Sequence, residues 1–99
     1  MSEAASCRVD VWLWRARFFR SRSLAQKFVE SGAVRLTRDG RERRLDRASR
    51  PVQVGDLLVF ALGARLLAVR VSELGIRRGP AAEARGLYAS LEGSGESAG

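Results

Sequence analysis

The residues most able to do chemistry in this chain are its arginines. Five arginines and one lysine lie within residues 8–27, RVDVWLWRARFFRSRSLAQK, where aromatic and aliphatic residues separate them. A guanidinium presents a planar set of N–H donors that matches phosphate oxygens and stacks on bases. A basic surface held on an apolar frame is typical of a protein that binds a polyanion.

The positive charge is concentrated in one half of the chain. The 99 residues include 18 basic and 11 acidic side chains, a net charge of +7. Residues 1–50 hold 13 basic and 6 acidic residues, whereas residues 51–99 hold five of each. The whole excess therefore lies in the first half, which indicates a localised basic patch.

The composition argues against catalysis. The chain has no histidine, so the usual general base, proton shuttle and metal ligand is missing. Its one cysteine, Cys7, excludes an intramolecular disulfide and the common zinc sites, and we expect a bystander rather than a reactive thiol. Asp10 and Asp56 are the acids that best fit a catalytic role, but their positions favour a helix cap and a turn. We expect no enzyme activity, no cofactor and no metal.

The sequence also favours a cytoplasmic protein. No apolar run approaches the roughly 20 residues that span a bilayer. The opening MSEAASC lacks the basic start and long apolar stretch of a signal peptide. A single cysteine suits a reducing compartment. We therefore expect no membrane association.

Apolar spacing predicts two short helices near the N-terminus. The first runs from about residue 10 to 17 with Asp10 as its N-cap, and the second from residue 22 to about 31. Ser21 is the expected N-cap of the second helix, and Gly32 is the expected left-handed residue that ends it. The side chains expected to hold this pair to the core are Leu13, Ala16, Leu24 and Phe28.

The rest of the chain is typical of a small sheet. Strands are predicted over residues 33–37, 57–60 and 66–72, the last two paired antiparallel through a turn at 62–65. Asp39-Gly40 predicts a turn, and residues 38–50 a surface loop with at most a short edge strand. Pro80 fits the first turn of a helix that would run to about Leu91.

Several motifs, in their order and spacing, resemble the RNA-binding domain first described in ribosomal protein S-four, the αL motif. The matching residues are Arg8-Val9-Asp10, Leu13, Arg15, Ser21-Arg22, Ala25, Phe28, Gly32, Val34 and Leu36, followed by Val52-Gln53-Val54-Gly55-Asp56-Leu57-Leu58-Val59-Phe60. The resemblance covers about residues 8–60. Where the family continues with Val-Asn-Gly, this chain has LTRDG at 36–40, a longer turn in which Thr37 is the nearest equivalent of the asparagine.

Two further segments narrow the resemblance. Trp12-Leu13-Trp14 and the later RRGPAAEA at 77–84 are similar to the bacterial fifteen-kilodalton heat-shock protein group and to short ribosome-quality-control proteins. Both groups bind the large ribosomal subunit when it carries a stranded nascent chain on tRNA. The resemblance implies a non-catalytic, ribosome-associated protein that binds large-subunit ribosomal RNA and tRNA, in the heat-shock stress response or in ribosome quality control. We expect it to be a monomer.

The expected RNA contacts are the polar residues that the two helices and the following strand would present. They are Arg8, Arg15, Arg17, Arg20, Arg22, Gln26, Lys27, Arg35 and Thr37. Folded RNA is recognised largely through shape, phosphates and 2′-hydroxyls, which suits a rigid basic surface. Three alternatives stay open: a general DNA- or RNA-binding protein, the RNA-binding subunit of an RNA-modifying enzyme acting in trans, and a protein-interaction module that uses residues 80–91.

The elements together predict one small α+β domain. Two N-terminal helices pack on a small, mainly antiparallel twisted sheet, and a C-terminal helix follows. Residues 8–60 form the RNA-binding core and residues 61–91 complete the same domain, whereas 1–7 and 92–99 are expected to be disordered. Trp12, Phe18 and Phe19 are expected in the core. Trp14 is expected either to pack half-buried or to stack on a base.

Overall fold

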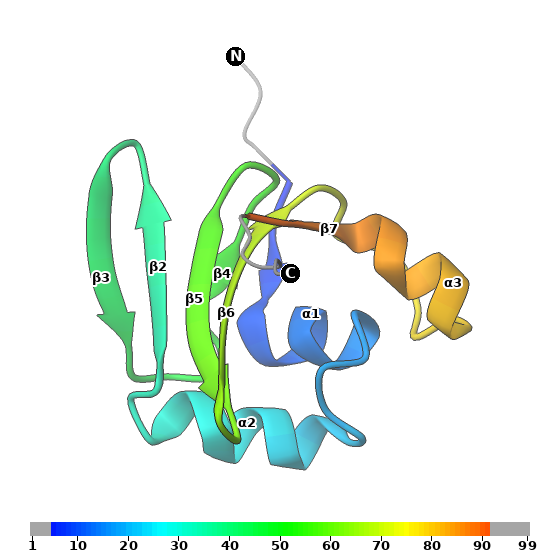
Figure 1. The fold of residues 1–99 in the computed structure, drawn as a ribbon, viewed down its shortest axis with the longest axis horizontal. Helices are drawn as coiled ribbons and strands as arrows, with labels where there is room; N and C mark the ends of the chain where they lie inside the picture. Colours follow the sequence, from blue (N-terminus) through cyan, green and yellow to red (C-terminus); the bar gives the residue numbers. More distant parts are fainter. Residues whose placement is uncertain (1–4, 92–99) are drawn as a thin grey trace.

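A computed structural model describes residues 5–91, so the tails at 1–4 and 92–99 lie outside the described residues. In chain order the elements are β1 (Cys7–Arg8), α1 (Val9–Arg15), α2 (Arg22–Glu30), β2 (Val34–Arg38), β3 (Arg41–Leu45), β4 (Pro51–Val52), β5 (Leu57–Leu62), β6 (Arg65–Val71), α3 (Ala81–Ala84), the 3-10 turn η1 (Arg85–Leu87) and β7 (Tyr88–Ser90). The predicted α+β class is confirmed (Figure 1). Cys7 already belongs to a strand, so the expected disorder of residues 1–7 does not extend to it.

The main sheet has the order β3-β2-β5-β6-β7, and each pair of neighbours is antiparallel. Alternate side chains point to opposite faces of a strand. On the inner face, Leu36 lies opposite Leu58, and Leu58 lies opposite Val69; all three are buried. The short β1 pairs with β4 beside this sheet. Figure 1 shows α1 against the β5–β6 part of the sheet and α2 running past the ends of its strands.

The second helix begins and ends as the sequence predicts. The Ser21 hydroxyl accepts a hydrogen bond from the Leu24 N–H at 3.2 Å, and Gly32 follows the helix with φ of +83°. Such a cap stabilises a helix by about 1 kcal/mol. Ala25 and Val29 are buried, but Leu24 is 49% exposed, so its expected place in the core is wrong. Leu24 lies one residue outside the stripe at i, i+3 and i+4 that contacts the sheet.

The first helix is shifted from its prediction. It starts at Val9 with Arg8 at the N-cap position, so Asp10 lies in the first turn rather than capping the helix. It ends at Arg15 because Arg17 adopts φ of +67°, a left-handed conformation that stops the helix. The connection to α2 therefore runs from residue 16 to 21 and is longer than the gap between the two predicted helices.

The segment expected to be a surface loop contains a five-residue edge strand. Residues 41–45 pair with β2 in register, with Arg38 opposite Arg41. Asp39 and Gly40 have φ of 54° and 76°, as a two-residue type I′ hairpin turn requires. The charged residues of β3 obscured its strand pattern, because four of its five side chains are exposed.

The C-terminal helix is much shorter than predicted. Pro80 is the N-cap residue, α3 ends at Ala84, and the chain then leaves the helix through η1 into β7, which pairs with β6. Gly86 weakens a continued helix. The buried Leu87 also uses its carbonyl oxygen to accept from the Ser72 N–H at 2.8 Å. The residues of the predicted helix are therefore divided between a helical turn and an edge strand.

The core fills the space between the helices and the inner face of the sheet. Trp12 is fully buried, and its indole Nε1–H donates to the Glu73 carbonyl oxygen at 2.9 Å. Phe18 contacts Phe60 edge-on at 5.3 Å and Tyr88 at 4.8 Å between ring centroids. The predictions for Trp12 and for both phenylalanines are confirmed, although Phe18 and Phe19 are only partly buried. Aromatic contacts of this kind lock α1, its following loop and β7 together.

Candidate nucleic-acid interface

Two of the predicted RNA-binding arginines are used inside the protein. The Arg15 Nη1 donates to the carbonyl oxygens of Leu74 at 3.3 Å and Gly75 at 2.8 Å, and Arg17 donates to the Gly79 carbonyl at 2.6 Å. The Arg15 Nε is buried. These bonds attach α1 and its following loop to residues 73–79, so both arginines position the loop that leads into α2.

Arg78 completes this attachment from the opposite side. Its guanidinium donates to the Trp14 carbonyl at 3.1 Å and to the Phe19 carbonyl at 3.4 Å, and lies 5.9 Å from the centre of the Trp14 ring. Trp14 is partly buried beneath it, which fits the packing alternative better than free presentation of the ring. The role of Arg78 was missed because nothing in the RRGP sequence links it to α1.

Arg8 is held by Asp10. The Arg8 Nε and Nη2 each donate to one carboxylate oxygen of Asp10 at 3.0 Å, and the Val11 N–H donates to the same carboxylate at 2.8 Å. Asp10 is 2% exposed, so its charge requires these partners. The hydrogen bond with Asp10 raises the pKa of Arg8 above its ordinary value.

Of the predicted RNA-binding cations, the three that remain free lie just before α2 and along it. Among the described residues, Arg20, Arg22 and Lys27 are exposed and make no side-chain hydrogen bond or ion pair. Gln26, on the same exposed side of the helix, makes a long 3.4 Å contact with Glu30. We call Arg20, Arg22, Gln26 and Lys27 the helical patch. Arg22 occupies the first position of the helix, where the unpaired N–H groups and the helix dipole already favour an anion.

The last two predicted contacts lie elsewhere. Arg35 and Thr37 project from the outer face of β2, whereas α2 packs on the inner face. Arg35 donates to the Glu42 carboxylate at 2.9 Å, and both side chains are about half exposed. The structure therefore brings the helical patch together on one element and separates it from Arg35 and Thr37.

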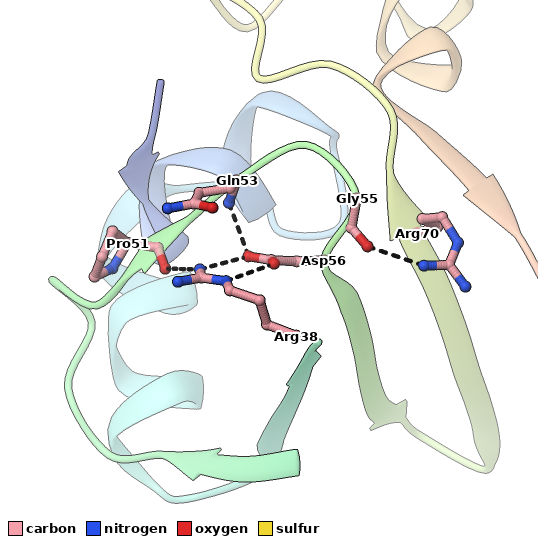
Figure 2. A network of polar contacts seen from close by, with 6 residues as sticks. All are labelled: Arg38, Pro51, Gln53, Gly55, Asp56 and Arg70. Carbon is pink, nitrogen blue, oxygen red and sulfur yellow. Dashed lines mark hydrogen bonds and ion pairs between the residues drawn. The ribbon is translucent and has the colours of Figure 1, made fainter. Parts of the chain in front are cut away.

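A second buried carboxylate supports the hairpin. Asp56, 2% exposed, accepts two hydrogen bonds from Arg38 at 2.8 and 2.7 Å and one from the Gln53 N–H at 2.8 Å (Figure 2). Arg38 also donates to the Pro51 carbonyl at 3.3 Å. The hydrogen bond with Asp56 raises the pKa of Arg38. The turn role expected for Asp56 is confirmed, and its ion pair ties β2 to the turn before β5.

The remaining features concern the reactivity of the cysteine, metal sites and membrane-spanning helices. Burial raises the pKa of the Cys7 thiol, which disfavours the reactive thiolate. Within residues 5–91, no cluster of histidine, cysteine or acidic side chains is arranged to hold a metal ion. No helix in that range is long and apolar enough to cross a membrane.

Comparison with known proteins identifies the class of protein to which this fold and basic surface belong. The family model described as S4 domain matches residues 7–36, the segment that contains α1, α2 and the start of β2, which makes this an S4-domain protein. The heat shock protein 15 homolog of Haemophilus influenzae is 34% identical over 87 residues, 88% of this chain and 63% of that protein. Heat shock protein 15 of Escherichia coli K12 is 33% identical over 85 residues, 86% of this chain and 60% of that protein.

A solved structure agrees with these relatives. Heat shock protein 15 of Vibrio cholerae, described as trimeric, shares the fold with a TM-score of 0.75 at 31% identity, over 88% of this chain and 83% of that chain. The chain belongs to the heat shock protein 15 family. It spans about three fifths of the length of the curated relatives named above.

Proposed function

We propose that this protein is a non-catalytic RNA-binding protein whose primary contact is the helical patch. The observation that carries the proposal is the set of free cations just before α2 and along its exposed side, on a helix capped by Ser21 and packed through Ala25 and Val29. Like charges repel one another, so a rigid cluster without acidic partners is suited to a polyanion. The S4 domain match and the heat shock protein 15 relatives support RNA as that polyanion.

The more specific function, a role at the ribosome, rests on the resemblance to the heat-shock and ribosome-quality-control proteins. The RNA is large-subunit ribosomal RNA together with tRNA, on large subunits that carry a stranded nascent chain, in the cytoplasm. The test is co-sedimentation of the protein with free large subunits, with large subunits carrying peptidyl-tRNA, and with assembled ribosomes. Enrichment on the peptidyl-tRNA-bearing subunits supports this function. Equal recovery with all three particles contradicts it and leaves general RNA binding.

Neutralising the helical patch is expected to weaken RNA binding without unfolding the protein. The variant Arg22→Gln/Lys27→Gln should bind an RNA hairpin about tenfold more weakly at ~0.1 M salt, because each lost phosphate contact removes counterion release. The slope of log affinity against log salt should fall by about 1 to 2. Fluorescence anisotropy over a KCl series measures both quantities.

The matched control changes two exposed arginines outside the patch, Arg65→Gln/Arg85→Gln, which make no side-chain hydrogen bond or ion pair within residues 5–91. An equal loss in the control would contradict the patch assignment.

Arg15→Ala is expected to lower the melting temperature instead, since Arg15 holds two backbone carbonyls. Equal affinity for RNA and B-form DNA of the same length would favour a general nucleic-acid-binding protein.

The chain alone is expected to be a monomer. Light scattering should then give a mass of 10.9 kDa in dilute solution. A mass three times larger would match the assembly described for the Vibrio cholerae relative and overturn this expectation.

A further inference from the structure

A second basic site lies on the inner face of the β2–β3 hairpin, beyond the region that the helices cover. It is a hollow of about 520 Å³. Its lining residues are Leu36, Arg38, Asp39, Arg41, Arg43, Leu45, Arg50 and Pro51. None of them belongs to the helical patch, and none of the four arginines was among the RNA contacts that the sequence indicated.

Strand register explains why arginines line this hollow. Arg38 lies opposite Arg41, and Leu36 lies opposite Arg43, so all four side chains share the face that carries the buried Leu45. Where the family pattern has Val-Asn-Gly, this chain has LTRDG, and the structure places the additional length in a longer hairpin that ends in the two-residue turn Asp39-Gly40, not in a longer turn. That extension supplies part of the lining of the hollow. The site therefore depends on a feature in which this chain departs from the pattern.

The arginines of the hollow keep several donors available. Arg38 is fixed by Asp56 and Pro51 through its Nε and Nη2, and its Nη1 has no partner among the described residues. Figure 2 shows this nitrogen pointing away from Asp56. The side chains of Arg41 and Arg43 make no hydrogen bond or ion pair within residues 5–91.

Acidic side chains only partly balance this charge. Asp56 pairs with Arg38, and Asp46 lies 3.8 Å from Arg50. The acidic residue Asp39 is itself among the lining residues. The apolar lining includes Leu36, which is 4% exposed, so part of the wall has a low dielectric that strengthens the field of the arginines.

We infer that this hollow binds a phosphate group of the RNA backbone, as a second contact separate from the helical patch. The inference rests on the proposed function. A phosphodiester carries one negative charge shared by two non-bridging oxygens, which can accept from guanidinium groups of different strands, and arginine matches that geometry with paired N–H donors. The exposed Arg41 and Arg43 supply further donors around the Nη1 of Arg38. The RNA would then be held at α2 and at the hairpin, which sets its orientation on the protein.

The test compares one variant expected to weaken RNA binding with another expected to strengthen it, both measured on the same RNA hairpin. Arg41→Gln/Arg43→Gln should weaken binding roughly tenfold and lower the salt slope by about 1, as the loss of one phosphate contact predicts. Asp39→Asn should tighten binding roughly twofold to threefold, because it removes a repulsive charge. Asparagine also tolerates the left-handed conformation of residue 39, so the hairpin turn is kept. The control is again Arg65→Gln/Arg85→Gln.

The outcomes separate this inference from the proposed function. If the Arg41/Arg43 variant matches the control while the Arg22/Lys27 variant loses affinity, the inference that the hollow binds a phosphate is overturned and the proposed function stands. If the wild-type protein does not bind the hairpin, the proposed function fails. Titration with inorganic phosphate, followed by NMR of the arginine Nε–H signals, then tests independently of RNA whether the hollow binds an anion. Shifts at Arg41 and Arg43 but not at Arg65 support an anion site, and their absence overturns it.

Discussion

Replacing Trp12 by alanine is expected to cost about 3 to 5 kcal/mol of unfolding free energy, the largest effect of any single change considered. Trp12 is fully buried among residues of the sheet and α1, so its removal leaves a cavity that a small core cannot fill. The change also removes the only side-chain donor to the Glu73 carbonyl within the described residues. Urea unfolding followed by circular dichroism measures the loss.

Two further variants make that experiment decisive. Trp12→Phe keeps an aromatic ring but removes the indole N–H, and is expected to cost less than the alanine change, about 1 to 2 kcal/mol. Leu66→Ala removes a side chain that is 75% exposed and should change stability by less than about 0.5 kcal/mol. A Trp12→Ala loss as small as that of Leu66→Ala would contradict the assigned core.

Replacing Asp56 by alanine is expected to be the second largest change, a loss of about 2 to 3 kcal/mol. The carboxylate is 2% exposed and accepts three hydrogen bonds, so its removal leaves the Gln53 N–H and two Arg38 donors without their partner. Arg38 keeps some contact with water, which limits the penalty. Thermal and urea unfolding should report the same loss.

An exposed ion pair provides the matched comparison. Glu42→Ala breaks the pair with Arg35, in which both side chains are about half exposed, and should cost no more than about 0.5 kcal/mol. In a double-mutant cycle, Asp56→Ala with Arg38→Ala should show coupling of about 1 to 3 kcal/mol, since the residues contact each other directly. Additive effects of the two changes would show that the pair does not stabilise the hairpin.

The structure also shows which parts of the fold were predictable. The Ser21 cap, the left-handed Gly32 and the Asp39-Gly40 turn follow from local backbone chemistry, and each was predicted correctly. The end of α1 and the change from α3 to β7 were not. Both depend on contacts between segments distant in the sequence, such as that of Phe18 with Tyr88, which local propensity does not encode.

The candidate site divides in the same way. The sequence identified the basic N-terminal half and the cations of the helical patch. It gave no means of distinguishing Arg15 and Arg17, which bind backbone carbonyls, from Arg22, which stays exposed, so all three were predicted to contact RNA. A strongly basic segment does not reveal which guanidinium groups will meet backbone carbonyls. That depends on where residues 73–79 pass over α1, a contact across about 60 positions of the chain.

By itself, the sequence determined the class of domain, its two N-terminal helices with the Ser21 cap of the second, and the half of the chain that carries the charge, because caps, turns and strand alternation act over a few residues. Only the tertiary structure decided how the individual arginines are used. Arg15, Arg17 and Arg78 hold the loop between the helices, Arg22 remains free, and Arg41 and Arg43 meet Arg38 around a hollow. The physical reason is that a guanidinium can donate to a carbonyl, a carboxylate or a phosphate, and folding alone sets which of them lies within reach.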